Sequence, residues 1–214
     1  MALADGRRSV ARAATRSSGL ALASVTAVLK TLIENGLASR GVTSQLGGDA
    51  TISALPPDRV PSGSDERAQL NIFLYLVSPH ARLRIDDSRG SRPTLAVDLH
   101  YLITAYGAQD YQTEILLGHT IELLEEQSTL EREAIRTALD ALSASADHRV
   151  VPPTTAALAA SDLAEQIDRI TIVPEFLGTE EMAKLWSALQ ARYRPSATYK
   201  VSAVPVASGK GAPR

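Results

Sequence analysis

The stretch "RPTLAVDLHYLITAYG", residues 92–107, alternates between two kinds of side chain. One side is apolar throughout and consists of Leu95, Val97, Leu99, Tyr101, Ile103 and Ala105. The other side carries Asp98 and His100, two positions apart. Because side chains of a strand point alternately to its two faces, this period predicts a β-strand over residues 94–106. The face with Asp98 and His100 is either a candidate active site or the outer face of a sheet.

The rest of the chain shows a mixture of strand and helix patterns. "QLNIFLYLVSP", residues 69–79, predicts a strand with both faces largely covered, and shorter patterns predict strands at 51–55, 168–176 and 196–206. Apolar residues at helical spacing predict helices at 20–37, 111–127, 130–142 and 178–190. Residues 56–68, 80–92 and 143–157 are expected to be loops. This order predicts an α+β fold, a single domain with a mixed or antiparallel sheet and packed helices.

The overall composition limits the classes of protein. We expect one domain over residues 19–206, between a disordered basic segment, 1–18, and a flexible tail, 207–214. A net charge of −2 argues against a nucleic-acid binder, and the absence of cysteine excludes disulfides and thiolate metal sites. The apolar stretch 19–29 continues into an amphipathic helical pattern, so we expect no export signal, no membrane span and a cytoplasmic location.

A search for catalytic patterns finds little beyond Asp98 and His100. An Asp can orient a His that acts as a base, but the sequence contains no G-x-S-x-G nucleophile motif. His80, His119 and His148 lack metal-ligand spacing. The sequence therefore predicts no catalytic residue, no metal and no cofactor. We expect His119 to be a packed or half-buried imidazole and Trp186, on the amphipathic helix 178–190, to anchor the core.

Four blocks of the sequence together resemble a known family. They are "LNIFLYLVSPHARLR", "RPTLAVDLHYLITAYG", "EILLGHTIELLEEQSTL" and "ITIVPEFLGTEEMAKLWSALQARYRPSATYKVSAVPV". The set resembles the N-terminal domain of the cap, or tail-terminator, family of extracellular contractile injection systems. The resemblance covers residues 20–206, and Pro195 stands where the family tends to carry an apolar residue.

The resemblance implies a tail-terminator-like fold and a structural role without catalysis. Such a cap ends the inner tube and anchors the last sheath ring, at the end of the particle distal to the baseplate. Its partners would be further copies of itself in a six-fold ring, the tube protein and the sheath protein. A soluble adaptor and a small hydrolase using Asp98 and His100 remain as alternatives. From Pro205, which lacks an N–H, we also expect residues 196–206 to form an edge strand at a subunit or sheath contact.

Overall fold

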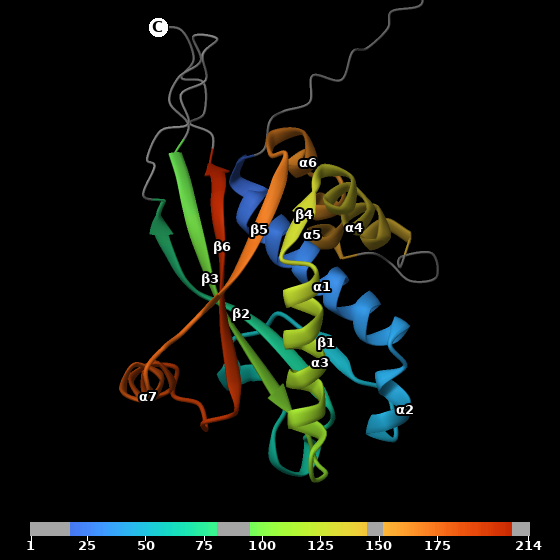
Figure 1. Cartoon of the computed structure of the whole chain (residues 1–214), viewed down its shortest axis with the longest axis vertical. Coiled ribbons are helices and arrows are strands. Elements are labelled where there is room, and N and C mark those ends of the chain that lie inside the picture. Colours follow the sequence, from blue (N-terminus) through green and yellow to red (C-terminus); the bar gives the residue numbers. More distant parts are fainter. Residues whose placement is uncertain (1–17, 81–94, 145–151, 207–214) are drawn as a thin grey trace, which may run out of the picture.

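The computed structural model describes residues 18–80, 95–144 and 152–206 (Figure 1). The predictions for segment 1–17, for the tail 207–214 and for His148 lie outside the described residues. The helices are α1 (Ala21–Ser39), α2 (Val42–Leu46), α3 (Gln112–Glu126), α4 (Arg132–Ala144), α5 (Pro153–Ala159), α6 (Leu163–Gln166) and α7 (Thr179–Ala188). The strands are β1 (Thr51–Ser53), β2 (Gln69–Pro79), β3 (Leu95–Tyr106), β4 (Thr129–Glu131), β5 (Arg169–Glu175) and β6 (Ser196–Val206). Short 3₁₀ turns occupy Ser18–Leu20, Pro57–Arg59 and Gly63–Asp65.

The strands form one six-stranded mixed sheet with the order β1-β2-β3-β6-β5-β4. The β1–β2 pair is parallel and the other four pairs are antiparallel, which confirms the predicted α+β fold with a mixed sheet. Helices α1, α3 and α4 lie together to one side of the sheet, whereas α7 lies apart from them at the far end of β5 (Figure 1). The two faces of the sheet therefore have different surroundings.

The apolar face of β3 forms the centre of the core. Leu99, Tyr101 and Ile103 are buried there against α1, whose Val25 and Val28 are fully buried. Burial of side chains of this size stabilises a fold by roughly 1.5–3 kcal/mol each. The Tyr101 hydroxyl also lies 2.9 Å from the Thr26 hydroxyl, which satisfies a buried polar group at the contact of strand and helix.

Helices α1 and α3 approach each other closely at Gly36. A Cβ atom on Gly36 would lie 2.3 Å from Cδ2 of the buried Leu123. A larger residue at position 36 would therefore force the Leu123 side chain to move within a packed core.

Helix α1 is the one helix among the described residues with the length and composition of a membrane span, with a mean hydropathy of 1.2. Of that window, 56% is buried inside the protein. Its apolar residues therefore contribute to the core of this fold.

The structure contradicts the expected edge position of residues 196–206. Strand β6 is central, because β3 pairs with it on one side and β5 on the other. Its neighbour β5 pairs only with Thr198–Ser202, so Pro205 lies beyond the last pair on that side and is in register with Ala96 of β3. The missing N–H of Pro205 marks the end of a central strand, which is the other position where a sheet tolerates proline.

Two local predictions were also wrong, and one short helix was missed. Residues 153–157, expected as loop, begin α5, because a proline in the first turn already has a helical φ angle. Leu130 lies in the short strand β4, and the helix predicted at 130–142 begins at Arg132. Helix α2 is too short to show a period in the sequence, and it follows Gly41, which has a φ angle of 63°.

A polar cluster on the open face of the sheet

Asp98 and His100, the two residues singled out in the sequence, lie on the face of the sheet opposite the core. Leu76, His100, Lys200 and Val173 follow one another in register across β2, β3, β6 and β5. Helices α1, α3 and α4 pack on the other face, whose buried side chains form the main core.

The loop after α7 covers part of this open face. Trp186 is buried, as predicted, and its ring meets that of Tyr193 edge-on with the centroids 5.8 Å apart. The Arg194 guanidinium lies over the Tyr106 ring and also binds Glu66 at 2.6 Å. These contacts hold the connection between α7 and β6 against β3.

Asp98 and His100 do not pair with each other. Asp98 Oδ1 lies 2.8 Å from Nδ1 of His80, and His100 Nδ1 lies 2.7 Å from Oε2 of Glu175. Both residues are more buried than the outer face of a sheet implies, with exposed fractions of 8% and 9%. In the hydrolase alternative, Asp98 was expected to orient His100. In the structure the carboxylate bound to His100 is that of Glu175.

His100 also binds a serine through its second ring nitrogen. The Ser78 hydroxyl lies 2.7 Å from Nε2, which completes a chain from Ser78 through His100 to Glu175. Ser78 and Glu175 lie 22 and 75 residues from His100 in sequence. Only the strand order β2-β3-β6-β5 brings them together, so no local motif could have revealed the chain.

Tyr75 lies at the border of this cluster. Its hydroxyl donates to Glu175 Oε2 at 3.5 Å, and its ring centroid lies 6.1 Å from that of His100. Burial first, and the charge of Glu175 second, raise the pKa of Tyr75 to about 12. The phenol is therefore neutral near pH 7 and acts as a hydrogen-bond donor.

The geometry has two chemical interpretations. A serine that is bonded to a histidine, which is in turn bonded to a carboxylate, forms the arrangement that activates a nucleophile. The same bonds also act as a clamp, because they join β2, β3 and β5 across the intervening β6 and satisfy each buried polar group. A hydrolase needs oxyanion donors and a substrate cleft in addition, whereas the clamp needs nothing more. Over the described ranges, no group of three or more His, Cys, Asp or Glu residues could hold a metal ion.

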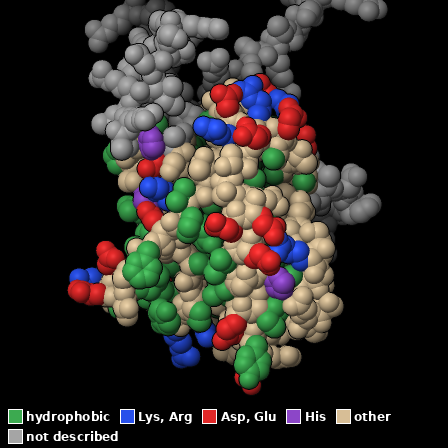
Figure 2. All heavy atoms as spheres, in the orientation of Figure 1, with side chains coloured by type: hydrophobic (Ala, Val, Ile, Leu, Met, Phe, Trp, Pro, Cys, Tyr) green, Lys and Arg blue, Asp and Glu red, His purple; other side chains and the backbone are tan. Residues whose placement is uncertain are grey.

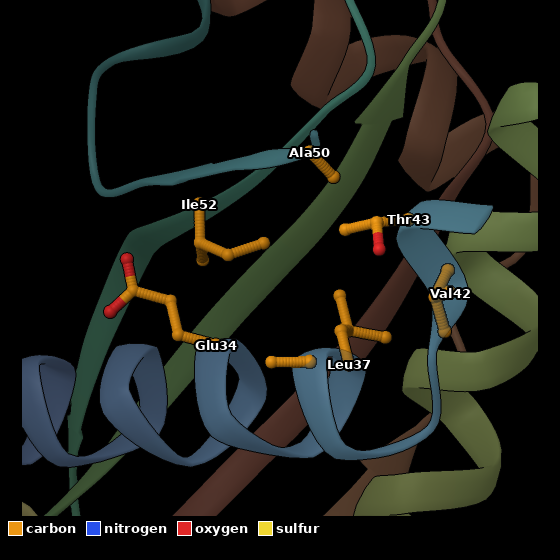
Figure 3. Close-up of a pocket in the computed structure, with 7 residues that line it drawn as sticks. Glu34, Leu37, Val42, Thr43, Ala50 and Ile52 are labelled. Atoms are coloured by element: carbon orange, nitrogen blue, oxygen red, sulfur yellow. The ribbon is translucent and has the colours of Figure 1, made fainter. Parts of the chain in front are cut away.

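A small hollow lies on the helix side of the sheet, between α1, α2 and β1 (Figure 3). Its volume is about 160 Å³, and its lining is mostly apolar, with Leu37, Val42 and Ile52 among the contributors. The one carboxylate, that of Glu34, is bound to Lys30. Small-molecule sites are usually larger and contain several convergent polar groups, so this hollow suits at most one aliphatic side chain.

The surface combines an apolar area with paired charges. Figure 2 shows hydrophobic side chains gathered between α7 and α3, and Phe176, just after β5, has an exposed fraction of 91%. Acidic residues of α3 and α6 are partly neutralised, since Arg40 binds Glu122 and Arg136 binds Glu165, both at 2.7 Å. His119 is half-buried as predicted, with Nε2 3.1 Å from Gln45 Oε1.

The six-stranded sheet, its packed helices and this cluster define a single α+β domain. The chain belongs to the Pvc16 N-terminal domain family, whose model matches residues 24–214. The predicted family is thereby confirmed.

Two solved structures are similar to this chain. One is the PVC sheath/tube terminator of an extracellular contractile injection system in its extended state, with 21% identity, a TM-score of 0.47, and coverage of 84% of this chain and 57% of that one. The other is the tube-terminating cap of the anti-feeding prophage, with 18% identity, a TM-score of 0.46, and coverage of 83% and 54%. This chain thus spans little more than half the length of either. A comparison with curated proteins found no match.

Proposed function

We propose that this chain is a structural cap of a contractile injection system. It ends the inner tube and anchors the last sheath ring at the end distal to the baseplate. The observation that carries the proposal is membership of the Pvc16 N-terminal domain family over residues 24–214. The sequence blocks at 97–107 and 184–199, which resemble the cap family, support the same role.

The proposed partners are further copies of this chain in a six-fold ring, the tube protein and the sheath protein. A ring needs a head-to-tail interface that closes on itself. The exposed apolar residues near α7, above all Phe176, offer surface for such contacts. The location proposed for the chain is the assembled particle, and the site of assembly is the cytoplasm.

The proposed role involves no catalysis. Ser78, His100 and Glu175 hold three strands together, and their contribution is to the shape of the sheet. A rigid sheet suits a subunit that must present fixed surfaces to several neighbours.

Deletion of the gene tests the role directly. Without a terminator, tube polymerisation has no stop and the sheath has no anchor, so we expect absent, unstable or variable-length particles in negative-stain images. Complementation with the intact gene should restore a single length. Particles of normal length that contract normally in the deletion strain would refute the cap function.

A further inference from the structure

One exposed side of helix α3 has a gap at its centre. Residues 114, 118, 121 and 125 follow one another at spacings of four, three and four, so they lie on one face of the helix. All of them are exposed, and Ile121 has an exposed fraction of 45%. This α3 stripe consists of Glu114, Gly118, Ile121 and Glu125.

Packing within the described part of the chain does not explain Gly118. A Cβ atom there would meet nothing within 4 Å beyond its own stretch of helix, whereas at Gly36 it would meet Leu123. Glycine in the interior of a helix is less favourable than alanine, because it loses more conformational freedom on folding. The gap at Gly118 therefore leaves room for a side chain of a second molecule.

The acid at the C-terminal end of the α3 stripe has no basic partner in the described residues. Arg40 binds Glu122 and Glu126 of the same helix, but Glu125 forms no ion pair with a described residue. Helical side chains lean towards the N-terminus, so the Glu125 side chain leans over the turn that carries Ile121. An apolar centre beside an unpaired carboxylate is complementary to an apolar side chain beside a cation.

Charge selects one aromatic residue of this chain as the match. The strongly exposed aromatic residues of the described ranges are Tyr111, Phe176 and Tyr193, with exposed fractions of 74%, 91% and 63%. Tyr111 directly follows Asp110 and Phe176 directly follows Glu175, so each would bring a further acid to the stripe. Tyr193 stands between two arginines.

The loop that carries Tyr193 is already held in place. The Tyr193 ring rests edge-on against Trp186, and Arg194 is fixed by Glu66 at 2.6 Å. Arg192 is exposed and forms no ion pair with a described residue. An aromatic anchor that is positioned before binding loses little freedom when it binds, which favours affinity.

The loop and the stripe lie on opposite faces of the sheet. Helix α3 packs on the core face through Leu116 and Leu123, whereas the loop lies against the open face at Tyr106. The loop of one copy therefore meets the stripe of another copy. A contact between two different surfaces repeats from copy to copy, as a closed ring requires.

We propose that this contact joins neighbouring copies of the chain, with Tyr193 of one copy packed over Gly118 and Ile121 of the next. Arg192 of the first copy then pairs with Glu125 of the second. The choice of a second copy as partner rests on the proposed function, in which the chain forms a ring.

Charge reversal on each surface tests the contact, read by light scattering after size exclusion over a range of concentrations. We expect the intact chain to reach masses above its 22.8 kDa. Arg192→Glu and Glu125→Arg should each raise the dissociation constant at least about tenfold, because like charges then meet. Asp140→Arg, the same kind of reversal at an exposed position of α4, is the matched control and should change nothing.

Mixing the two variants gives the sharper result. In an equal mixture of Arg192→Glu and Glu125→Arg, each altered surface meets the oppositely altered surface of the other variant. The dissociation constant should return to within about threefold of that of the intact chain. Two variants that merely fold badly would not restore each other.

Gly118→Ala tests the gap itself. It should raise the urea midpoint of unfolding of the monomer, because alanine favours the helix, and yet weaken the association. Gly19→Ala is the control, since a Cβ atom at this exposed glycine also meets nothing within 4 Å, and its association should be unchanged.

Four results would overturn the proposal. They are a chain that stays monomeric at every concentration, a mixture that stays dissociated, equal dissociation by Asp140→Arg, and Gly118→Ala with unchanged association. All are measured on the purified chain without tube or sheath. The cap function is tested in the deletion strain, so either can fail while the other stands.

Discussion

Strands β2 and β6 each have 11 residues, yet their places in the sheet are opposite. Strand β6, with a proline near its end and a polar side, lies at the centre between β3 and β5. Strand β2, the more apolar of the two, is paired on its outer side by no described strand from Ile72 to Pro79. The pattern of a strand reports what covers its faces, whereas its neighbours along the sheet are decided by the path of the whole chain.

Proline substitution should give the largest difference in stability between variants of β6 and variants of β2. Val201 is fully buried, and β3 and β5 pair with it at Leu99 and Ile172. Val201→Pro removes a donor at the centre of the sheet, so we expect a loss of roughly 3 kcal/mol or more, by analogy with other proline insertions. Urea unfolding or the yield of folded protein measures it.

Val77→Pro is the matched substitution on β2. The His80 N–H points to β3, so alternation turns the Val77 N–H away from β3, and the loss should be at most about 1 kcal/mol. Equal losses for the two variants would contradict the assignment of β6 as central and of Val77 as unpaired on the outer side of β2.

The first part of β2 should behave unlike the part from Ile72 to Pro79. The buried Asn71 side chain accepts from the Leu55 N–H and donates to the Leu55 carbonyl, both at 2.9 Å. Asn71→Leu leaves these backbone groups unpaired, and we expect a loss of about 1–3 kcal/mol in the free energy of unfolding. A variant as stable as the parent would show that the bonds between Asn71 and Leu55 do not hold the segment after β1 against the edge of β2.

The polar cluster links the two strands through β3 and β5. As a surface residue, His100 would contribute well under about 1 kcal/mol, but it is buried and bonded at both ring nitrogens. We expect His100→Ala to cost about 1–3 kcal/mol. Without catalysis, a fluorophosphonate probe should not label Ser78 in the parent. Labelling of Ser78 that His100→Ala abolishes would favour a hydrolase.

Alkaline titration tests the bulge residue Tyr75. Its pKa is raised from 10.0 to about 12, so the unfolded chain loses this proton first. The contribution of Tyr75 to stability is therefore complete below pH 10 and is lost as the pH rises from 10 to about 12. Tyr75→Phe should remove one component near pH 12 from the absorbance titration at the phenolate band. A component that titrates near pH 10 instead would place Tyr75 in solvent.

Much of the fold could be read from the sequence, because β2, β3, β6 and α3 have strong local periods. The order of the strands could not, since it depends on contacts between residues far apart in the chain. The same limit applied to the polar cluster. His100 was found from its alternation with Asp98, but its true partners, Ser78 and Glu175, lie on other strands.

Labelling of intact particles tests the central claim, the cap function, most directly. An epitope tag on this chain, detected with gold-conjugated antibody in negative-stain images, should mark one end of each particle, the end distal to the baseplate. The label should remain at that end after the sheath contracts. Gold along the sheath, at the baseplate, or only on material outside the particles would contradict the assignment as a cap.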